Sequence, residues 1–174
     1  ADYYVTNKST IPAVYGGFGT SVQAYGFDFS INFSYQLGGY QYDGTYANFM
    51  STPLSSSTGN NIHVDALNAW TKDNPSQTIP RWQFGDTYSA GGSTRFLTSS
   101  RYLNIENIAV GYTLPARLTR KALINSLRFY VAADNVWYWS ARQGFDPRQS
   151  FSDTTNATNY SPMRSVSGGV TLKF

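Results

Sequence analysis

Catalytic or metal chemistry in this chain would have to use one histidine. His63 is the single histidine, it lies two residues before Asp65, and the chain has no cysteine. Triads and metal sites bring several such groups together, so a lone histidine beside one carboxylate is more typical of loop packing. We therefore expect no enzyme activity, no metal site and no cofactor.

Three charged residues instead indicate a contact surface. Asp28, Arg128 and Asp134 each take the polar position in a run where apolar and polar residues alternate. Successive side chains of a β-strand point to opposite faces, so this alternation places all three on the polar face of a sheet. There they would pair with each other or contact another protein segment.

A second group of candidate contacts is aromatic. Trp70, Trp82, Tyr88 and Phe96 lie in a long segment, residues 39–100, that is rich in Gly, Ser, Thr, Asn and Pro. Aromatic rings offer large contact areas, so these rings could stack on sugar rings or on peptide side chains. The alternative, which we favour, is that they pack the loop itself or meet a covering protein.

The elements that position these residues are predicted to be β-strands. Between residues 26 and 38, apolar and polar residues alternate without a break, which matches the period of a strand and not that of a helix. Tyr25 and Gly26 would form a two-residue turn before this run. The same alternation predicts the full set of strands at about 14–24, 26–38, 102–114, 126–139 and 164–174.

The third of these strands requires an irregularity. Leu103 and Ile105 fall on the opposite parity from Ile108 and Val110. One extra residue between the two pairs would put all four side chains on the same face, and a β-bulge is the usual way in which a strand accommodates it. We therefore expect a bulge near Glu106-Asn107.

The connections between the predicted strands alternate between short and long. Residues 39–100, with one helical candidate at 64–71, and residues 140–162 form long loops, whereas the turn at 25–26 and a short helical turn at 116–124 are brief. Transmembrane β-barrels show this asymmetry, with short periplasmic turns and long extracellular loops. A strand of ~12 residues tilted by ~40° also crosses roughly the thickness of a bilayer core.

Composition agrees with the wall of a β-barrel. The chain has 11 Phe, 14 Tyr and 4 Trp, against 13 Lys and Arg and 10 Asp and Glu, and its formal net charge is +3. The basic residues are scattered, which argues against nucleic-acid binding. No apolar run reaches the ~18 residues of a transmembrane helix. The N-terminus shows no signal-peptide pattern, so we expect a processed or cut end.

We therefore predict an all-β fold that is a portion of an antiparallel transmembrane β-barrel. Closed membrane barrels have at least about eight strands, so about five strands would be incomplete on their own. The alternative is a secreted β-sandwich that binds carbohydrate through the long loop. A sandwich packs its apolar faces against each other, whereas a barrel leaves them facing lipid.

The segment Tyr102–Pro115, with the sequence YLNIENIAVGYTLP, resembles a signature of the SusC/RagA-like TonB-dependent transporters of Bacteroidetes outer membranes. Further motifs similar to that family occur in order along nearly the whole chain. Before the signature these are Tyr15–Gly19, Gly26–Ser30 and Pro80–Trp82, and after it Leu127–Val131, Asp134-Asn135, Gly144–Pro147, Tyr160–Pro162 and a last strand that ends in Phe174. The ordered set is more specific than any one motif.

This resemblance implies that residues 1–174 are the C-terminal part of a TonB-dependent receptor barrel in the bacterial outer membrane. It implies import of glycans or peptides, energised through TonB, under a SusD-like surface lipoprotein that acts as a lid. The implied partners are the remainder of the barrel and its plug, that lipoprotein, the TonB complex through an N-terminal part, and outer-membrane lipid.

The resemblance also assigns roles to the candidate residues. Asp28, Arg128 and Asp134 would face the lumen and the plug. The loop aromatics would contact the substrate or the lid. Phe174 would end the strand that closes the barrel against its first strand.

Overall fold

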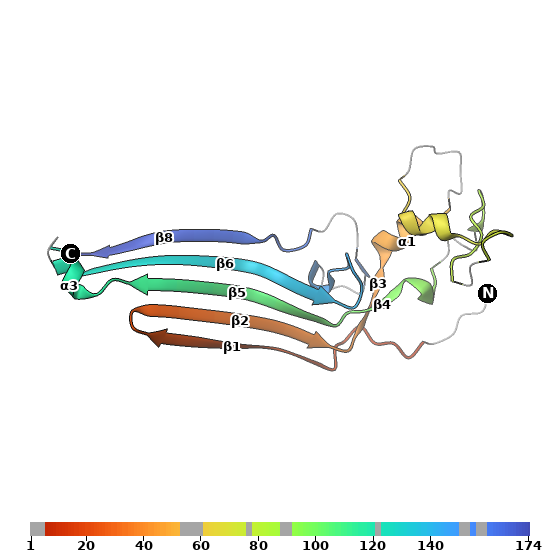
Figure 1. The fold of residues 1–174 in the computed structure, drawn as a ribbon. Helices are drawn as coiled ribbons and strands as arrows, with labels where there is room; N and C mark the ends of the chain where they lie inside the picture. The colour runs from red at the N-terminus through yellow and green to blue at the C-terminus, as the bar shows by residue number, and fades with distance from the viewer. Residues whose placement is uncertain are drawn as a thin grey trace.

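The protein was analysed as a computed structural model, which describes residues 6–52, 61–75, 78–87, 92–120, 123–149, 154–155 and 160–174. Its main feature is one antiparallel sheet of five long strands in the order β1-β2-β5-β6-β8 (Figure 1). The strands are β1 (Val14–Ala24), β2 (Phe27–Leu37), β5 (Tyr102–Thr113), β6 (Ser126–Ser140) and β8 (Ser165–Lys173). These bounds lie close to those predicted from the alternation.

Short connections gather at one end of the sheet and long ones at the other (Figure 1). Tyr25 and Gly26 connect β1 to β2 with φ angles of 52° and 87°. Two successive positive φ values are the signature of the tight turn that matches the twist of a hairpin. At the same end, α3 (Ala116–Thr119) follows β5, in part of the range where a short helical turn was predicted.

The predicted bulge in β5 is present. The pairing register of β5 shifts at Glu106 against both of its neighbours, between Ile105 and Asn107 on the β6 side and opposite Asn32/Phe33 on the β2 side. The shift brings Ile105 onto the same face as the apolar residues beyond the bulge. In β6, Asn135 lies at the matching irregularity with a φ of 50°.

The segment predicted as one long loop contains regular structure. It includes β3 (Tyr40–Asp43), α1 (Gly44–Met50), β4 (Leu97–Ser99) and the 3-10 helices η1 (Val64–Asn68) and η2 (Thr94–Phe96). The helical candidate at 64–71 is thus a shorter 3-10 helix. With β7 (Thr154–Thr155), β3 and β4 form a second sheet in the order β4-β3-β7, and η4 (Pro147–Gln149) lies in the last long connection. We call β3, α1, η1, η2, β4 and β7 the loop unit.

The two faces of the five-stranded sheet differ in chemistry. One face is apolar, and many of its side chains remain exposed, such as Val131 at 56% and Val170 at 55%. The buried hydrophobic cluster lies instead in the loop unit, around Met50 and Phe96. A β-sandwich would bury the apolar face against a second sheet, so this arrangement argues against the sandwich alternative.

Among the described residues, no helix combines the length and the apolar content needed to cross a bilayer.

Candidate functional site

The polar face holds an ion pair that crosses a strand. Asp28 on β2 and Arg128 on β6 are separated by β5, yet the Arg128 Nε donates to Asp28 Oδ1 at 3.0 Å and its Nη2 donates to Oδ2. Two parallel N–H···O bonds give such a pair a fixed geometry. Of the three charged residues predicted on this face, the structure therefore brings these two together.

A glycine makes this crossing possible. Gly111 lies directly opposite Asp28, between the two charged side chains. A Cβ at Gly111 would be 2.5 Å from the Arg128 Nη2 and 2.5 Å from each carboxylate oxygen of Asp28. The pair thus occupies the space that a side chain would fill. Gly111 is also the glycine of the segment Tyr102–Pro115.

The third predicted charge lies apart from this pair. Asp134 Oδ1 accepts a hydrogen bond from the Asn107 Nδ2 at 2.7 Å, and its Oδ2 accepts one from the Ser165 Oγ at 3.0 Å. These bonds link β5, β6 and β8 on the polar face. Asp134 therefore fixes neighbouring strands and does not extend the Asp28–Arg128 pair.

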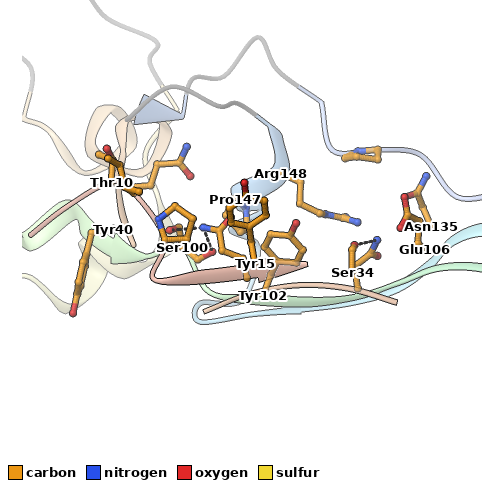
Figure 2. Close-up of a pocket in the computed structure, with 16 residues that line it drawn as sticks. Thr10, Tyr15, Ser34, Tyr40, Ser100, Tyr102, Glu106, Asn135, Pro147 and Arg148 are labelled. Carbon is orange, nitrogen blue, oxygen red and sulfur yellow. Dashed lines mark hydrogen bonds between the residues drawn. The ribbon is translucent and has the colours of Figure 1, made fainter. Parts of the chain in front are cut away.

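A pocket of about 680 Å³ opens on the polar face at the end near the loop unit. Its floor comes from four adjacent strands, and segments from the two long connections and the N-terminal part complete it (Figure 2). The floor residues are Tyr15 of β1, Ser34 and Gln36 of β2, Tyr102, Asn104 and Glu106 of β5, and Asn135 of β6. The other walls are formed by Thr10, Ile11, Pro12, Tyr40, Gln41, Ser100, Pro147, Arg148 and Pro162.

Asn104 is a pocket residue with one side-chain atom that has no hydrogen-bond partner. Its side chain is only 3% exposed, and its Nδ2 donates to the Ser34 Oγ at 3.3 Å. The Asn104 Oδ1 is buried and has no hydrogen-bond partner. Buried polar atoms almost always have a partner, so this acceptor is an exception that needs a reason. Gln36, by contrast, uses its Nε2 on the carbonyl oxygen and the Oγ of Ser100, at 3.1 and 3.0 Å.

Arg148 lines the same pocket, but its charge is already paired. Its Nε and Nη2 donate to the two carboxylate oxygens of Asp146 at 2.9 and 2.8 Å. Burial raises the pKa of Asp146, but the hydrogen bonds and the charge of Arg148 outweigh burial, so the pKa lies below its ordinary value. The guanidinium also lies 4.6 Å from the Tyr138 ring centroid. The pocket therefore gains little net positive charge from Arg148.

The predicted loop aromatics have different environments. Phe96 is 1% exposed and packs edge-on against Tyr42 and Tyr46, so its ring is part of the loop-unit core and is not a contact surface. Trp82 is half-buried against the same core, and Trp70 is 38% exposed. Tyr88 lies outside the described residues.

His63 has a local structural role. Its Nδ1 accepts a hydrogen bond from the Asp65 backbone N–H at 3.1 Å at the start of η1, and its ring packs edge-on against Tyr46. The Tyr46 hydroxyl donates to Asp65 Oδ2 at 2.7 Å. Burial, together with this hydrogen bond and the carboxylate charge, raises the pKa of Tyr46. The arrangement supports the start of η1 within the loop unit.

Sequence reasoning did not identify the pocket residues. Tyr102, Asn104 and Glu106 share one parity, and the bulge decides that this parity belongs to the polar face. The signal was therefore present in the sequence, as two polar-face positions before the bulge and the bulge residue Glu106 itself. Ser34 pairs directly with Asn104, a partnership that depends on strand order and cannot be read from either segment alone.

No protein-family model matches the chain. In sequence it is 24% identical over 168 residues to the TonB-dependent receptor P3 of Formosa agariphila, a match that covers 91% of this chain and 16% of the relative. The RagAB peptide importer is similar in structure in its closed-closed state, with a TM-score of 0.80, and in its open-open state, with a TM-score of 0.77. Both structures are 24% identical to this chain and cover all of it, and the chain covers 19% of the matched chain. It thus spans about a fifth or less of the length of these proteins, and it has the fold of a part of a transporter barrel.

Proposed function

We propose that this chain, which resembles the SusC/RagA-like TonB-dependent receptors in sequence and in fold, forms the C-terminal part of the barrel of an outer-membrane nutrient importer. The apolar face of the five-stranded sheet lies in the outer membrane, and the polar face lines the lumen. The intact receptor takes up glycans or peptides with energy supplied through TonB, and a SusD-like lipoprotein covers its outer end.

One observation carries this proposal. The five long strands form a single sheet (Figure 1). Its apolar face stays exposed, and its polar face holds a strand-crossing ion pair and a pocket. Lipid on one side and a polar lumen on the other are the environments that match these two faces. The similarity in fold to the RagAB peptide importer supports a place in the barrel of a transporter.

The Asp28–Arg128 pair has a further role in this proposal. It lies on the lumen side near the short turns, where the plug of the intact receptor would approach it. We expect Arg128→Gln in the intact receptor to reduce uptake and to loosen the plug. Unchanged uptake together with unchanged plug retention would rule out this contact.

The membrane orientation is tested with tryptophan fluorescence. Trp137 and Trp139 lie on the apolar face and are 48% and 45% exposed, whereas Trp70 and Trp82 belong to the region of the loop unit. In vesicles made with brominated lipids, which quench tryptophan emission, the fluorescence of Trp137 and Trp139 in the intact receptor should decrease. A variant with Trp137→Phe and Trp139→Phe should lose this quenched component.

The matched control carries Trp70→Phe and Trp82→Phe instead. It should keep the quenched component, because these two rings lie outside the proposed bilayer region. Equal quenching of both variants, or no quenching in either, would contradict the proposed membrane face. Uptake is tested separately, by growth on a glycan or a peptide mixture with and without the gene that encodes the receptor.

A further inference from the structure

We propose that Asn104, Ser34 and Glu106 form a saccharide-binding subsite in the wall of the lumen, with the rings of Tyr15 and Tyr102 as its apolar platform. The subsite is the pocket of about 680 Å³ at the end of the sheet near the loop unit (Figure 2). This inference rests on the proposed function, because it places the pocket on the path of an imported nutrient.

The side-chain oxygen of Asn104 is the first feature of the pocket that indicates a ligand. This side chain is held between neighbouring strands by its hydrogen bond to Ser34, so its position is fixed. Its Oδ1 nevertheless lacks a partner although the residue is 3% exposed and lines the pocket. Leaving a buried acceptor unpaired costs free energy, and a donor group of a ligand would recover it. The ligand should therefore present hydroxyl or N–H donors.

The charge of the pocket lining favours a neutral ligand over an anionic one. Arg148 is engaged by both carboxylate oxygens of Asp146, and Glu106 is an exposed carboxylate in the bulge. An anionic ligand would face Glu106 without a free guanidinium to compensate. A neutral ligand with many hydroxyl groups can instead donate to Glu106 and Asn104 together, and carboxylates and amides accept such bonds well.

The aromatic residues in the pocket lining favour a ligand that has an apolar face. Tyr15 is 76% exposed, and it lines the pocket together with Tyr102 and Pro147 (Figure 2). A sugar ring has an apolar C–H face and a rim of hydroxyl groups, and aromatic rings supply large, rigid contact areas for such faces. A peptide would also bring donors, but its terminal carboxylate would meet the Arg148 guanidinium of the lining already engaged by Asp146. These features together favour a saccharide over a peptide.

The test measures binding to the purified intact receptor. The probes are a set of neutral oligosaccharides and a set of short peptides, and the readout is titration calorimetry. Asn104→Ala and Ser34→Ala should each weaken binding of a saccharide by about tenfold, as expected when one hydrogen bond in a buried site is lost. Two separate substitutions guard against misfolding of one variant, and circular dichroism checks that each remains folded.

The matched control is Asn107→Ala. Asn107 is the same residue type on the same strand and the same face, but it bonds to Asp134 and lies outside the pocket. Its substitution should leave saccharide affinity unchanged. If Asn107→Ala weakens binding as much as Asn104→Ala does, the effect comes from the sheet and the subsite is wrong.

Other outcomes separate this inference from the proposed function. If a saccharide binds and both pocket variants bind it as tightly as the wild type, the subsite is overturned while the import proposal stands. If a peptide binds and Asn104→Ala weakens that binding instead, the saccharide assignment is overturned. If neither probe set binds the wild-type receptor, the subsite is also overturned, and the growth and fluorescence experiments still decide the proposed function.

Discussion

Gly111 determines what the neighbouring charges can do. Because it carries no side chain, Asp28 and Arg128 meet across β5. We predict that Gly111→Ala separates these two groups, since a methyl group would overlap atoms of both. In a double-mutant cycle, the coupling between Asp28 and Arg128 should be clear in the wild-type receptor and near zero in the Gly111→Ala background.

Gly168→Ala is the control for this cycle. A Cβ there would meet the Tyr130 carbonyl oxygen at 3.5 Å and the Val131 side chain at 3.9 Å, which are ordinary contacts. Coupling between Asp28 and Arg128 should persist in that background. Coupling that survives Gly111→Ala unchanged would show that the glycine is not what permits the pair.

Asp146 gives the last long connection a dependence on pH. Its pKa lies below the ordinary value of 3.8, so the ionised form stabilises the folded loop at pH values above 3.8. This stabilisation is lost as the pH falls below 3.8 toward the pKa of the folded state. Phe145, which is 3% exposed, should then become accessible, and pepsin should cleave beside it only at the lower pH values.

The comparison for this prediction is Asp146→Asn. It removes the titrating group and leaves the Arg148 charge buried without its partner, at a cost of about 2–3 kcal/mol. In the variant, cleavage beside Phe145 should therefore occur across the whole acidic pH range in which pepsin is active. The same steep pH dependence in both proteins would show that another group is responsible.

Among the elements, α1 depends on one aspartate for two separate contacts. Asp43 Oδ1 accepts from the Tyr46 backbone N–H at 2.9 Å as the N-cap, and its Oδ2 accepts from the Arg142 Nη1 at 2.6 Å. Arg142 comes from the other long connection and lies 3.5 Å from the centroid of the Tyr46 ring. The Asp43 side chain thus caps α1 and also links the two long connections through its ion pair with Arg142.

We predict that Asp43→Ala and Asp43→Asn differ in a measurable way. Both remove the charge that pairs with Arg142, but asparagine keeps an oxygen for the N-cap. Asp43→Ala should therefore destabilise α1 by about 1 kcal/mol more than Asp43→Asn does. Hydrogen exchange of the α1 amides measures the difference. Equal protection in the two variants would mean that the cap contributes nothing.

The strands could be predicted from the sequence more fully than the loop unit. In β2, the residue type at each position indicates which face of the sheet it occupies, because apolar and polar residues alternate from Phe27 onward. The loop-unit core instead brings Met50 and Phe96 together. These two residues are far apart in the chain, so their contact leaves no local pattern in the sequence. Phe96 was therefore named as a candidate contact beside the favoured alternative of loop packing, and it is buried in this core. Asn104 was missed because its face depends on the bulge at Glu106.

For the molecule as a whole, the same substitution at adjacent residues of one strand should have effects of very different size. Ile31 lies on the apolar face of β2, and Ser30 lies on the polar face. In the proposed barrel, Ile31→Arg places a charge in the hydrocarbon and should cost about 2–4 kcal/mol. Ser30→Arg places the same charge in the lumen and should cost much less. Urea unfolding of the receptor in lipid vesicles measures both values, and similar losses would contradict the assignment of the faces.

The edges of the sheet are also a property of the whole molecule. Within the described residues, β1 and β8 each pair with one neighbour in this sheet, β2 and β6 respectively. Open strand edges readily pair with further strands, which agrees with a wall that continues on both sides. The role of Phe174 in closing that wall stays a prediction; the residue itself is 84% exposed here.

The glycines of the polar face have a consequence for the width of the proposed channel. Tyr130 lies over Gly169, where a Cβ would be 2.6 Å from the Tyr130 hydroxyl oxygen, just as the ion pair lies over Gly111. The Asp28–Arg128 pair and the Tyr130 side chain therefore lie along the surface of the sheet, above these two glycines. In the proposed barrel, these side chains would leave the centre of the lumen clear at the level of the Asp28–Arg128 pair.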